Sequence, residues 1–146
     1  RNHQAVINIP DALVGEIRQA AEVAYPKECC GLLIGSKEKD RTFTVTEIAT
    51  SPNVAQGDHA DRFEVDPQVR FDVMRKLGDG PEQIIGHYHS HPDHAGAPSA
   101  TDLEMAFEPE MVWLIVSVEN GLALRPRAHI VDPATTRFRE IELHSH

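Results

Sequence analysis

Long apolar runs, clustered basic residues and dispersed cysteines are all missing from this 146-residue chain, and each absence excludes a class of protein. No apolar stretch approaches the roughly 20 residues that a membrane-spanning helix needs. The 23 acidic residues outnumber the 14 Lys and Arg residues and give a formal charge of −9. That balance argues against a nucleic-acid-binding surface, which needs clustered Lys and Arg. No signal-peptide pattern opens the chain, so we expect a cytoplasmic protein with no membrane partner.

Cysteine is scarce, and the two that occur, Cys29 and Cys30, are neighbours. Adjacent cysteines form a disulfide only with strain, so we expect free thiols in a reducing compartment. Their spacing is not the C-x-x-C of a zinc or redox motif. The H-x-E and P-C-x-x-C signatures of the zinc deaminases are also missing, which argues against a deaminase.

The apolar pattern predicts a single domain over residues 1–146, long enough to bury a core without disulfides. Helical spacing of apolar residues predicts helices over 10–24, 67–77 and 99–107. Short apolar or β-branched runs predict strands over 4–9, 28–35, 41–50, 83–85, 111–118, 122–131 and 137–143. We expect a polar surface loop over 51–61 and a frayed end over 144–146. This order of elements predicts an α/β fold, a mixed sheet in an α/β sandwich.

His89 and His91 lie two residues apart in the stretch 86–102, which follows the short apolar run 83–85. Residues i and i+2 of a strand point to the same face, so the two imidazoles can converge on one ion. Asp102, at the start of the following predicted helix, can bring a carboxylate to the same place. Two nitrogens and one oxygen are the ligands of a catalytic zinc with an open fourth position.

Each of these residues also has a structural interpretation. The two histidines could be polar residues held by hydrogen bonds at the end of a strand. Asp102 would favour the N-terminus of a helix, and Ser99 with Asp102 resembles a capping box. A capping role for Ser99 is compatible with catalysis if its hydroxyl also faces the substrate.

Glu28 is the best candidate for the general base that a zinc hydrolase needs. It precedes the apolar run Cys29–Gly35 and is not part of a charged turn, where surface acids are usually found. From the residues alone, a solvated acid at the start of a strand remains the alternative, and the favoured one.

Together these residues resemble the JAMM (MPN-plus, Mov34/PAD-1) metallopeptidases. The segment His89–Pro92, six residues, Ser99, two residues and Asp102 matches the family pattern H-[ST]-H-P-x6-S-x2-D completely, and Glu28–Gly35 resembles its early strand. The resemblance implies zinc bound by His89, His91 and Asp102, with Glu28 as general acid/base and Ser99 stabilising the oxyanion. It also implies an α/β sandwich of the MPN, cytidine-deaminase-like type.

His87 forms a second H-x-H with His89, but the Pro of the family pattern follows only His91. We therefore expect His87 beside the ligands or facing the substrate, and His59 and His94 in solvated loops. Phe63, followed by Asp66-Pro67, resembles a further family landmark before the second helix.

The resemblance implies zinc-dependent hydrolysis of a peptide or isopeptide bond at the C-terminal tail of a ubiquitin-like or sulfur-carrier protein. We expect a Gly-Gly tail, bound extended against an exposed strand edge, with residues 51–61 beside the groove. A non-catalytic module of the same fold that binds ubiquitin-like proteins is the alternative. It is disfavoured because this chain keeps every ligand of the pattern.

Overall fold

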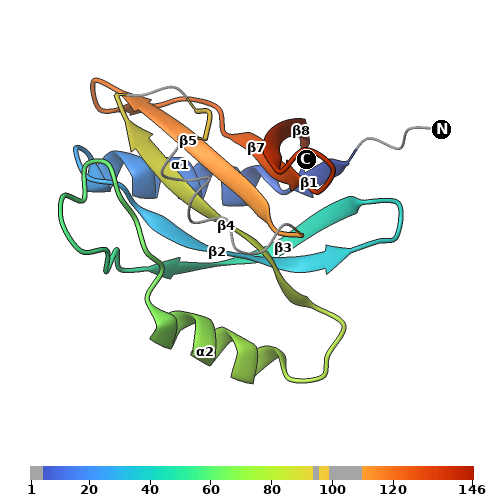
Figure 1. Cartoon of the computed structure of the whole chain (residues 1–146). Helices are drawn as coiled ribbons and strands as arrows, with labels where there is room; N and C mark the ends of the chain where they lie inside the picture. Colours follow the sequence, from blue (N-terminus) through green and yellow to red (C-terminus); the bar gives the residue numbers. More distant parts are fainter. Residues whose placement is uncertain (1–4, 94–95, 99–109) are drawn as a thin grey trace.

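The computed structural model describes residues 5–93, 96–98 and 110–146 (Figure 1). The elements in chain order are β1 (Val6–Ile9), α1 (Asp11–Ala24), β2 (Cys30–Lys37), β3 (Thr42–Ser51), α2 (Pro67–Leu77), β4 (Gln83–Pro92), β5 (Val112–Glu119), β6 (Leu122–Ala123), β7 (Arg127–Asp132) and β8 (Arg137–Ser145). The helix expected over 99–107 lies outside the described residues. Within the described part of the chain, no helix is both long and apolar enough to cross a membrane.

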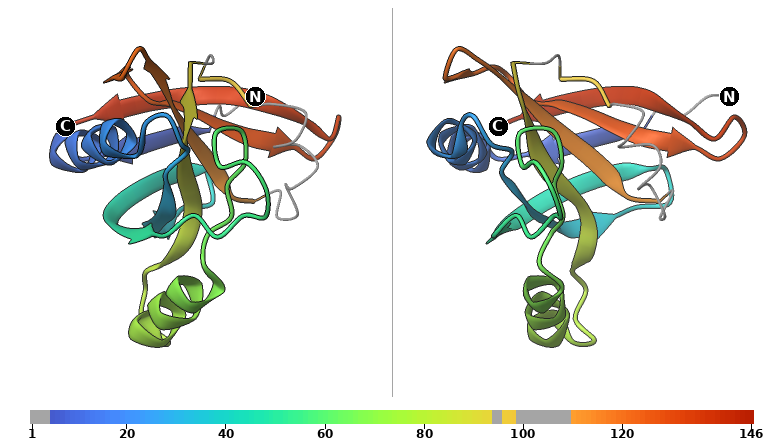
Figure 2. Two further views of the ribbon diagram at one scale, coloured as in Figure 1. Left: turned by 90° about the vertical axis from the view of Figure 1, so that its left-hand side faces the viewer. Right: turned by 60° about the vertical axis from the view of Figure 1, so that its left-hand side comes forward.

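The eight described strands form one mixed sheet, in the order β4-β2-β3-β1-β8-β7-β5-β6. β4 also pairs with β5, so the sheet curls until its first strand meets its seventh, as the two views in Figure 2 show. The pairings β1–β3, β1–β8 and β4–β5 are parallel, and the others are antiparallel. The mixed sheet expected from the sequence is confirmed.

The two described helices cover different faces of this sheet (Figures 1 and 2). α1 buries Ile17 and Ala21, four residues apart on one helical face, in the main core. α2 begins at Pro67 after its N-cap Asp66, whose side chain accepts a hydrogen bond from the Gln68 N–H. Its Val73 packs in a smaller cluster on the opposite side. Both helices match their predicted ranges.

Residues 122–131 form two strands, where the sequence predicted one. The Asn120-Gly121 turn has positive φ at both residues, as the Asn-Gly signal predicts, and β6 follows it. β6 ends at Ala123, and the Leu124 N–H makes one more hydrogen bond to β5, to the Ser117 carbonyl. The chain then passes Pro126 before β7 begins. Proline has no N–H to donate, so a strand is interrupted there.

The expectation of a frayed end at 144–146 is wrong. β8 continues to Ser145 and pairs in parallel with β1. The His146 N–H then donates to the Ile9 carbonyl at 3.2 Å, and its own carbonyl accepts from the Asp11 N–H at 2.7 Å. The last residues are therefore held between the end of β1 and the first turn of α1.

Close strand contact at Gly86 provides a stability test. Gly86 lies opposite Val112 in the β4–β5 pair, and a Cβ there would lie 2.3 Å from the Val112 carbonyl oxygen. Gly86→Ala should lower the free energy of unfolding by about 1–3 kcal/mol or more, since the obstructing atom is backbone. Gly15→Ala on α1 is the matched control: nothing lies within 4 Å of its Cβ. It should stabilise the protein by about 0.4–1 kcal/mol. Urea denaturation of both variants measures the difference, and equal stabilities would contradict the close contact.

Candidate metal and hydrolytic site

The two histidines of the sequence motif lie on one face of β4 and converge. The His89 side chain has 0% exposure and His91 has 6%. Their Nε2 atoms are 3.1 Å apart. The strand spacing therefore brings two imidazoles together, as the sequence predicted.

This separation fits a shared tetrahedral metal ion. Zinc binds imidazole nitrogen at about 2.0–2.1 Å, so two nitrogens on one tetrahedral ion lie about 3.3 Å apart. The observed 3.1 Å is close to that value. It is also a normal hydrogen-bond length. A hydrogen bond between the rings needs one ring to carry its proton on Nε2, whereas binding of a shared metal needs both Nε2 atoms without a proton. The donor pair is compatible with zinc.

Aromatic side chains hold His89 in place. The Phe63 ring stacks on the His89 imidazole with centroids 4.0 Å apart and planes 13° apart. Trp113 of β5 meets the same imidazole edge-on at 5.8 Å. His87 packs against the Trp113 ring at 4.3 Å, and its own ring centroid lies 6.2 Å from that of His89. These contacts restrict the His89 ring to one orientation.

Glu28 is buried, with 5% exposure, so the alternative of a solvated acid is wrong. It lies before β2, which begins at Cys30 and not at Glu28. Cys30 pairs with His89, and Cys29 is bonded twice to Ser90: its carbonyl accepts the Ser90 N–H at 3.1 Å, and its N–H donates to Ser90 Oγ at 2.8 Å. Continuing this register by one more residue leads Glu28 toward His91.

The burial of this segment raises the pKa of both neighbouring thiols. Burial is the largest cause that raises the pKa of Cys29, and the Glu28 charge adds to it. Burial also raises the pKa of Cys30 to about 12, with smaller contributions from Cys29 and Glu28. The segment therefore holds two neutral thiols beside a buried carboxyl group, and both cysteines are free, as expected.

The far side of the histidine pair is formed by β5 and the chain after β4. Ser117 of β5 is the register partner of His91 and is buried. The Asp93 carboxylate accepts from the Tyr25 hydroxyl at 2.7 Å and from the Asn120 N–H at 3.0 Å. His129 of β7 contacts the Gly96 carbonyl at 3.0 Å. The chain after β4 is thus attached to the C-cap of α1, to the turn after β5 and to β7.

The structure brings His89 and His91 together and buries Glu28 in the segment that is bonded to the same strand, while Ser99, Asp102 and His94 lie outside the described residues. Within residues 5–93, 96–98 and 110–146, no three His, Cys, Asp or Glu side chains converge as a metal group. A third ligand from Asp102 therefore stays a prediction. His59 is half-buried, and its ring bonds to the Ala55 carbonyl at 2.7 Å, so it belongs to the loop.

The sequence pattern assigns no role to three residues of this region. It marks Phe63 only as a landmark, although Phe63 stacks on His89. Ser90 bonds the segment that carries Glu28, and its place between the two histidines is the signal that could have identified it. Asn53 donates to the Glu28 carbonyl at 3.2 Å, and only the Ser-Pro-Asn turn sequence could have suggested it.

This chain belongs to the family described as prokaryotic homologs of the JAB domain, whose sequence model matches residues 10–128. The desampylase of Haloferax volcanii is 34% identical over 116 residues, covering 77% of this chain and 78% of that protein. The CysO-cysteine peptidase of Mycobacterium tuberculosis is 30% identical over 135 residues, covering 90% of this chain and 87% of the relative.

The fold agrees with that membership. The crystal structure of AF2198, a JAB1/MPN domain protein from Archaeoglobus fulgidus, superposes with a TM-score of 0.57 at 22% identity, over 96% of each chain. At that identity the likeness concerns the fold alone. It confirms the MPN-type α/β fold that the motif resemblance implied.

Thiol reactivity tests the burial of the Glu28 segment. The thiolate is the reactive species, and a raised pKa keeps Cys29 and Cys30 protonated at about pH 8. The folded protein should therefore react with a thiol reagent at least tenfold more slowly than the urea-unfolded protein. The pKa values of both thiols are higher in the folded protein than the unfolded value of about 8.5. Their contribution to the free energy of unfolding should therefore be complete below about pH 8.5 and should be lost as pH rises toward the folded-state pKa values. Equal labelling rates in the folded and unfolded protein would contradict this burial.

Proposed function

We propose that this chain is a zinc metallopeptidase that hydrolyses a peptide or isopeptide bond at the C-terminal tail of a ubiquitin-like, sulfur-carrier type protein. The observation that carries the proposal is the pair of buried imidazoles, 3.1 Å apart, next to the buried segment of Glu28, in a chain of the JAB family. Relatives named desampylase and CysO-cysteine peptidase support this substrate class. The Gly-Gly tail, the cytoplasmic location and a single domain over 1–146 are part of the proposal.

His89 and His91 would hold the zinc, with Asp102 as the third ligand. Bound there, zinc would act as a Lewis acid on the scissile carbonyl and lower the pKa of a water to about 7. The stacked Phe63 ring fixes the plane of His89, and the strand fixes the spacing of the two ligands. Such ordering reduces the reorganisation that metal binding costs.

Glu28 would move the proton. Its carboxylate would accept a proton from the attacking water and return it to the leaving amine nitrogen, as one general base and then one general acid. The surrounding burial excludes bulk water, which strengthens the electrostatic interactions of the carboxylate. The Ser99 hydroxyl would donate a hydrogen bond to the oxyanion that develops on the carbonyl.

The substrate tail would bind extended, with its backbone paired to a strand edge. Few strand edges of the curled sheet are free to pair with a substrate, because β4 is already hydrogen-bonded to both β2 and β5. Among the described strands, β3 beyond Thr44 pairs only with β2, so its outer edge is one place for an added strand. The loop that follows β3, within 51–61, would lie beside the tail.

Two alternative functions predict different products. A non-catalytic binding module would bind the carrier protein without cleaving it. A deaminase would act on nucleosides and leave carrier proteins intact. Intact mass analysis after incubation with Gly-Gly-tailed carrier fusions, and with nucleosides in parallel, distinguishes the peptidase, the binding module and the deaminase.

The metal assignment predicts one zinc per chain. His89→Ala and His91→Ala should each lose most of the zinc, because each removes one of two converging nitrogens. His87→Ala is the matched control from the same strand and should keep it. Elemental analysis of protein purified without chelator measures all three. Full zinc content in a His89→Ala, His91→Ala double variant would refute the site.

The assignment of the general base predicts that Glu28→Gln keeps zinc and fold but loses turnover. Gln can still hydrogen-bond to a water but cannot take up and release its proton, so kcat on a Gly-Gly-tailed carrier fusion should fall by about 10²–10⁴. KM should change much less, because no role in holding the tail is assigned to Glu28. The loss of activity at low pH that we expect for the wild-type protein should also be altered in Glu28→Gln. Near-normal turnover with normal zinc would remove Glu28 from the mechanism.

A further inference from the structure

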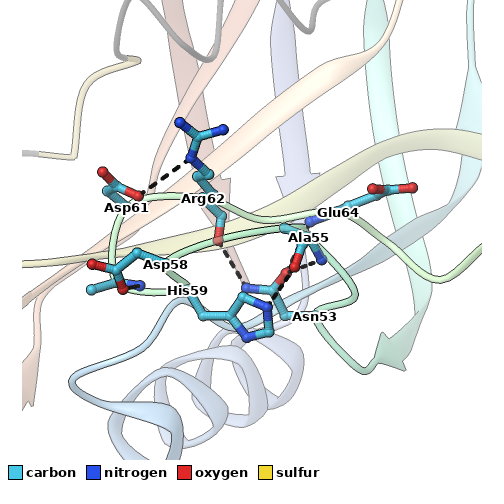
Figure 3. A network of polar contacts seen from close by, with 8 residues as sticks. Asn53, Ala55, Asp58, His59, Asp61, Arg62 and Glu64 are labelled. Atoms are coloured by element: carbon cyan, nitrogen blue, oxygen red, sulfur yellow. Dashed lines mark hydrogen bonds and ion pairs between the residues drawn. The ribbon is translucent and has the colours of Figure 1, made fainter.

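The segment that links β3 to α2 folds back on itself around the side chain of Asn53 (Figure 3). The Asn53 amide makes four hydrogen bonds: Nδ2 donates to the Glu28 and Arg62 carbonyls, and Oδ1 accepts from the Ala55 and Glu64 N–H groups. Two donors and two lone pairs are the whole capacity of an Asn side chain. Asn53 also forms an isolated β-bridge with Val65. Residues 53–65 are called the Asn53 loop below.

The Asn53 loop holds the main chain of Glu28 on both sides. The Glu28 N–H donates to the His59 carbonyl at 2.7 Å, and the Glu28 carbonyl accepts from Asn53 Nδ2 at 3.2 Å. The next residue, Cys29, is bonded to Ser90 of β4. The backbone that carries the Glu28 carboxyl group therefore lies clamped between the Asn53 loop and the strand of the two histidines.

The same side chain fixes the residue that contacts His89. Two of the four Asn53 hydrogen bonds go to Arg62 and Glu64, the residues directly before and after Phe63 (Figure 3). Phe63 is buried and stacks on the His89 ring at 4.0 Å. A shift of the Asn53 amide would thus be transmitted to the Glu28 backbone through one bond and to Phe63 through two.

We propose that Asn53 is a positioning residue that sets the Glu28 carboxyl group and the His89 imidazole relative to each other. This inference rests on the proposed function, in which Glu28 moves the proton and His89 binds the metal. Asn53 acts through these residues and is not assigned any contact with the substrate. Misplacing a catalytic group by about 1 Å can cost about 10²-fold in rate, so one amide can matter at a distance.

Asn53→Asp is the sharpest test because it keeps the shape of the side chain. The carboxylate can still accept from the Ala55 and Glu64 N–H groups, but it cannot donate to the Glu28 and Arg62 carbonyls and repels them. Asp58→Ala is the matched control in the same loop. Asp58 accepts from the Ala60 N–H at 2.8 Å, and this hydrogen bond involves neither Glu28 nor a neighbour of Phe63.

With a Gly-Gly-tailed carrier fusion as substrate, Asn53→Asp should lower kcat by about 10–100-fold and change KM less than about threefold. The acidic limb of its pH profile should shift, and zinc bound at saturating concentration should remain about one per chain. Hydrogen exchange at the Glu28 amide of the zinc-loaded protein should become at least about tenfold faster, while the Glu64 amide, whose acceptor is retained, should change less. Asp58→Ala should keep kcat within about twofold and leave both amides unchanged.

A purely structural loop residue would lower the melting temperature and leave kcat and the pH profile unchanged below the transition. That result for Asn53→Asp would overturn the proposal. If Asn53→Asp does not fold, His59→Ala replaces it, since the His59 ring braces the turn that presents its carbonyl to Glu28. Faster exchange at the Glu28 amide together with lower kcat would then support the proposal, and wild-type values of both would refute it.

Failure of the proposed function gives a different pattern. If the wild-type protein cleaves no Gly-Gly-tailed carrier, the substrate assignment fails, while exchange and zinc affinity still test the geometry. Asn53→Asp should then exchange faster at the Glu28 amide and bind zinc about tenfold more weakly, because Phe63 no longer fixes His89. Wild-type exchange and zinc affinity in that variant would overturn the inference by themselves.

Discussion

The double pairing of β4 is the constraint on which the site depends. β4 is bonded antiparallel to β2 and parallel to β5, so its register is fixed from both edges. A slip by one residue would turn every β4 side chain to the other face. Close approach at Gly86 keeps β5 near the strand. The positions of His89 and His91 are therefore consequences of the sheet as a whole, and not of their own contacts alone.

The site gathers its polar groups where the sheet is most buried. Glu28, His89 and His91 are all buried. A buried carboxyl group and two buried imidazoles cost desolvation energy unless they are paired or bound to an ion. The 3.1 Å contact between the two imidazoles offsets part of this cost for the histidines, while hydrogen bonds to the Glu28 N–H and carbonyl hold the main chain that carries the carboxyl group. Such an arrangement is expected where function, and not stability, determines the residues.

The sequence predicted the parts of this protein that depend on local pattern. The two-residue spacing of His89 and His91 follows from strand geometry, and both described helices follow from their apolar period and end signals. The burial of Glu28 could not be derived in this way, because it depends on His59 and Asn53, which lie far along the chain. For this residue the family pattern gave the role that the local sequence did not.

The errors have the same origin. Residues 144–146 look polar and terminal, but their backbone is bonded to β1 and α1, and no local signal reports such a partner. The break between β6 and β7 had a local sign in Pro126, which was outweighed by the apolar residues around it. Ser99 and Asp102 lie outside the described residues, so their place in the site stays a prediction.

The sheet order also bears on how the chain is made. β1 comes first in the described chain, yet one of its two partners is β8, the last strand. Such distant pairing raises contact order and slows folding. During synthesis from the N-terminus, β1 and β7 would each wait with an open edge until β8 left the ribosome. Nascent chains stalled before residue 137 would therefore expose two strand edges, which makes them targets for chaperones and proteases.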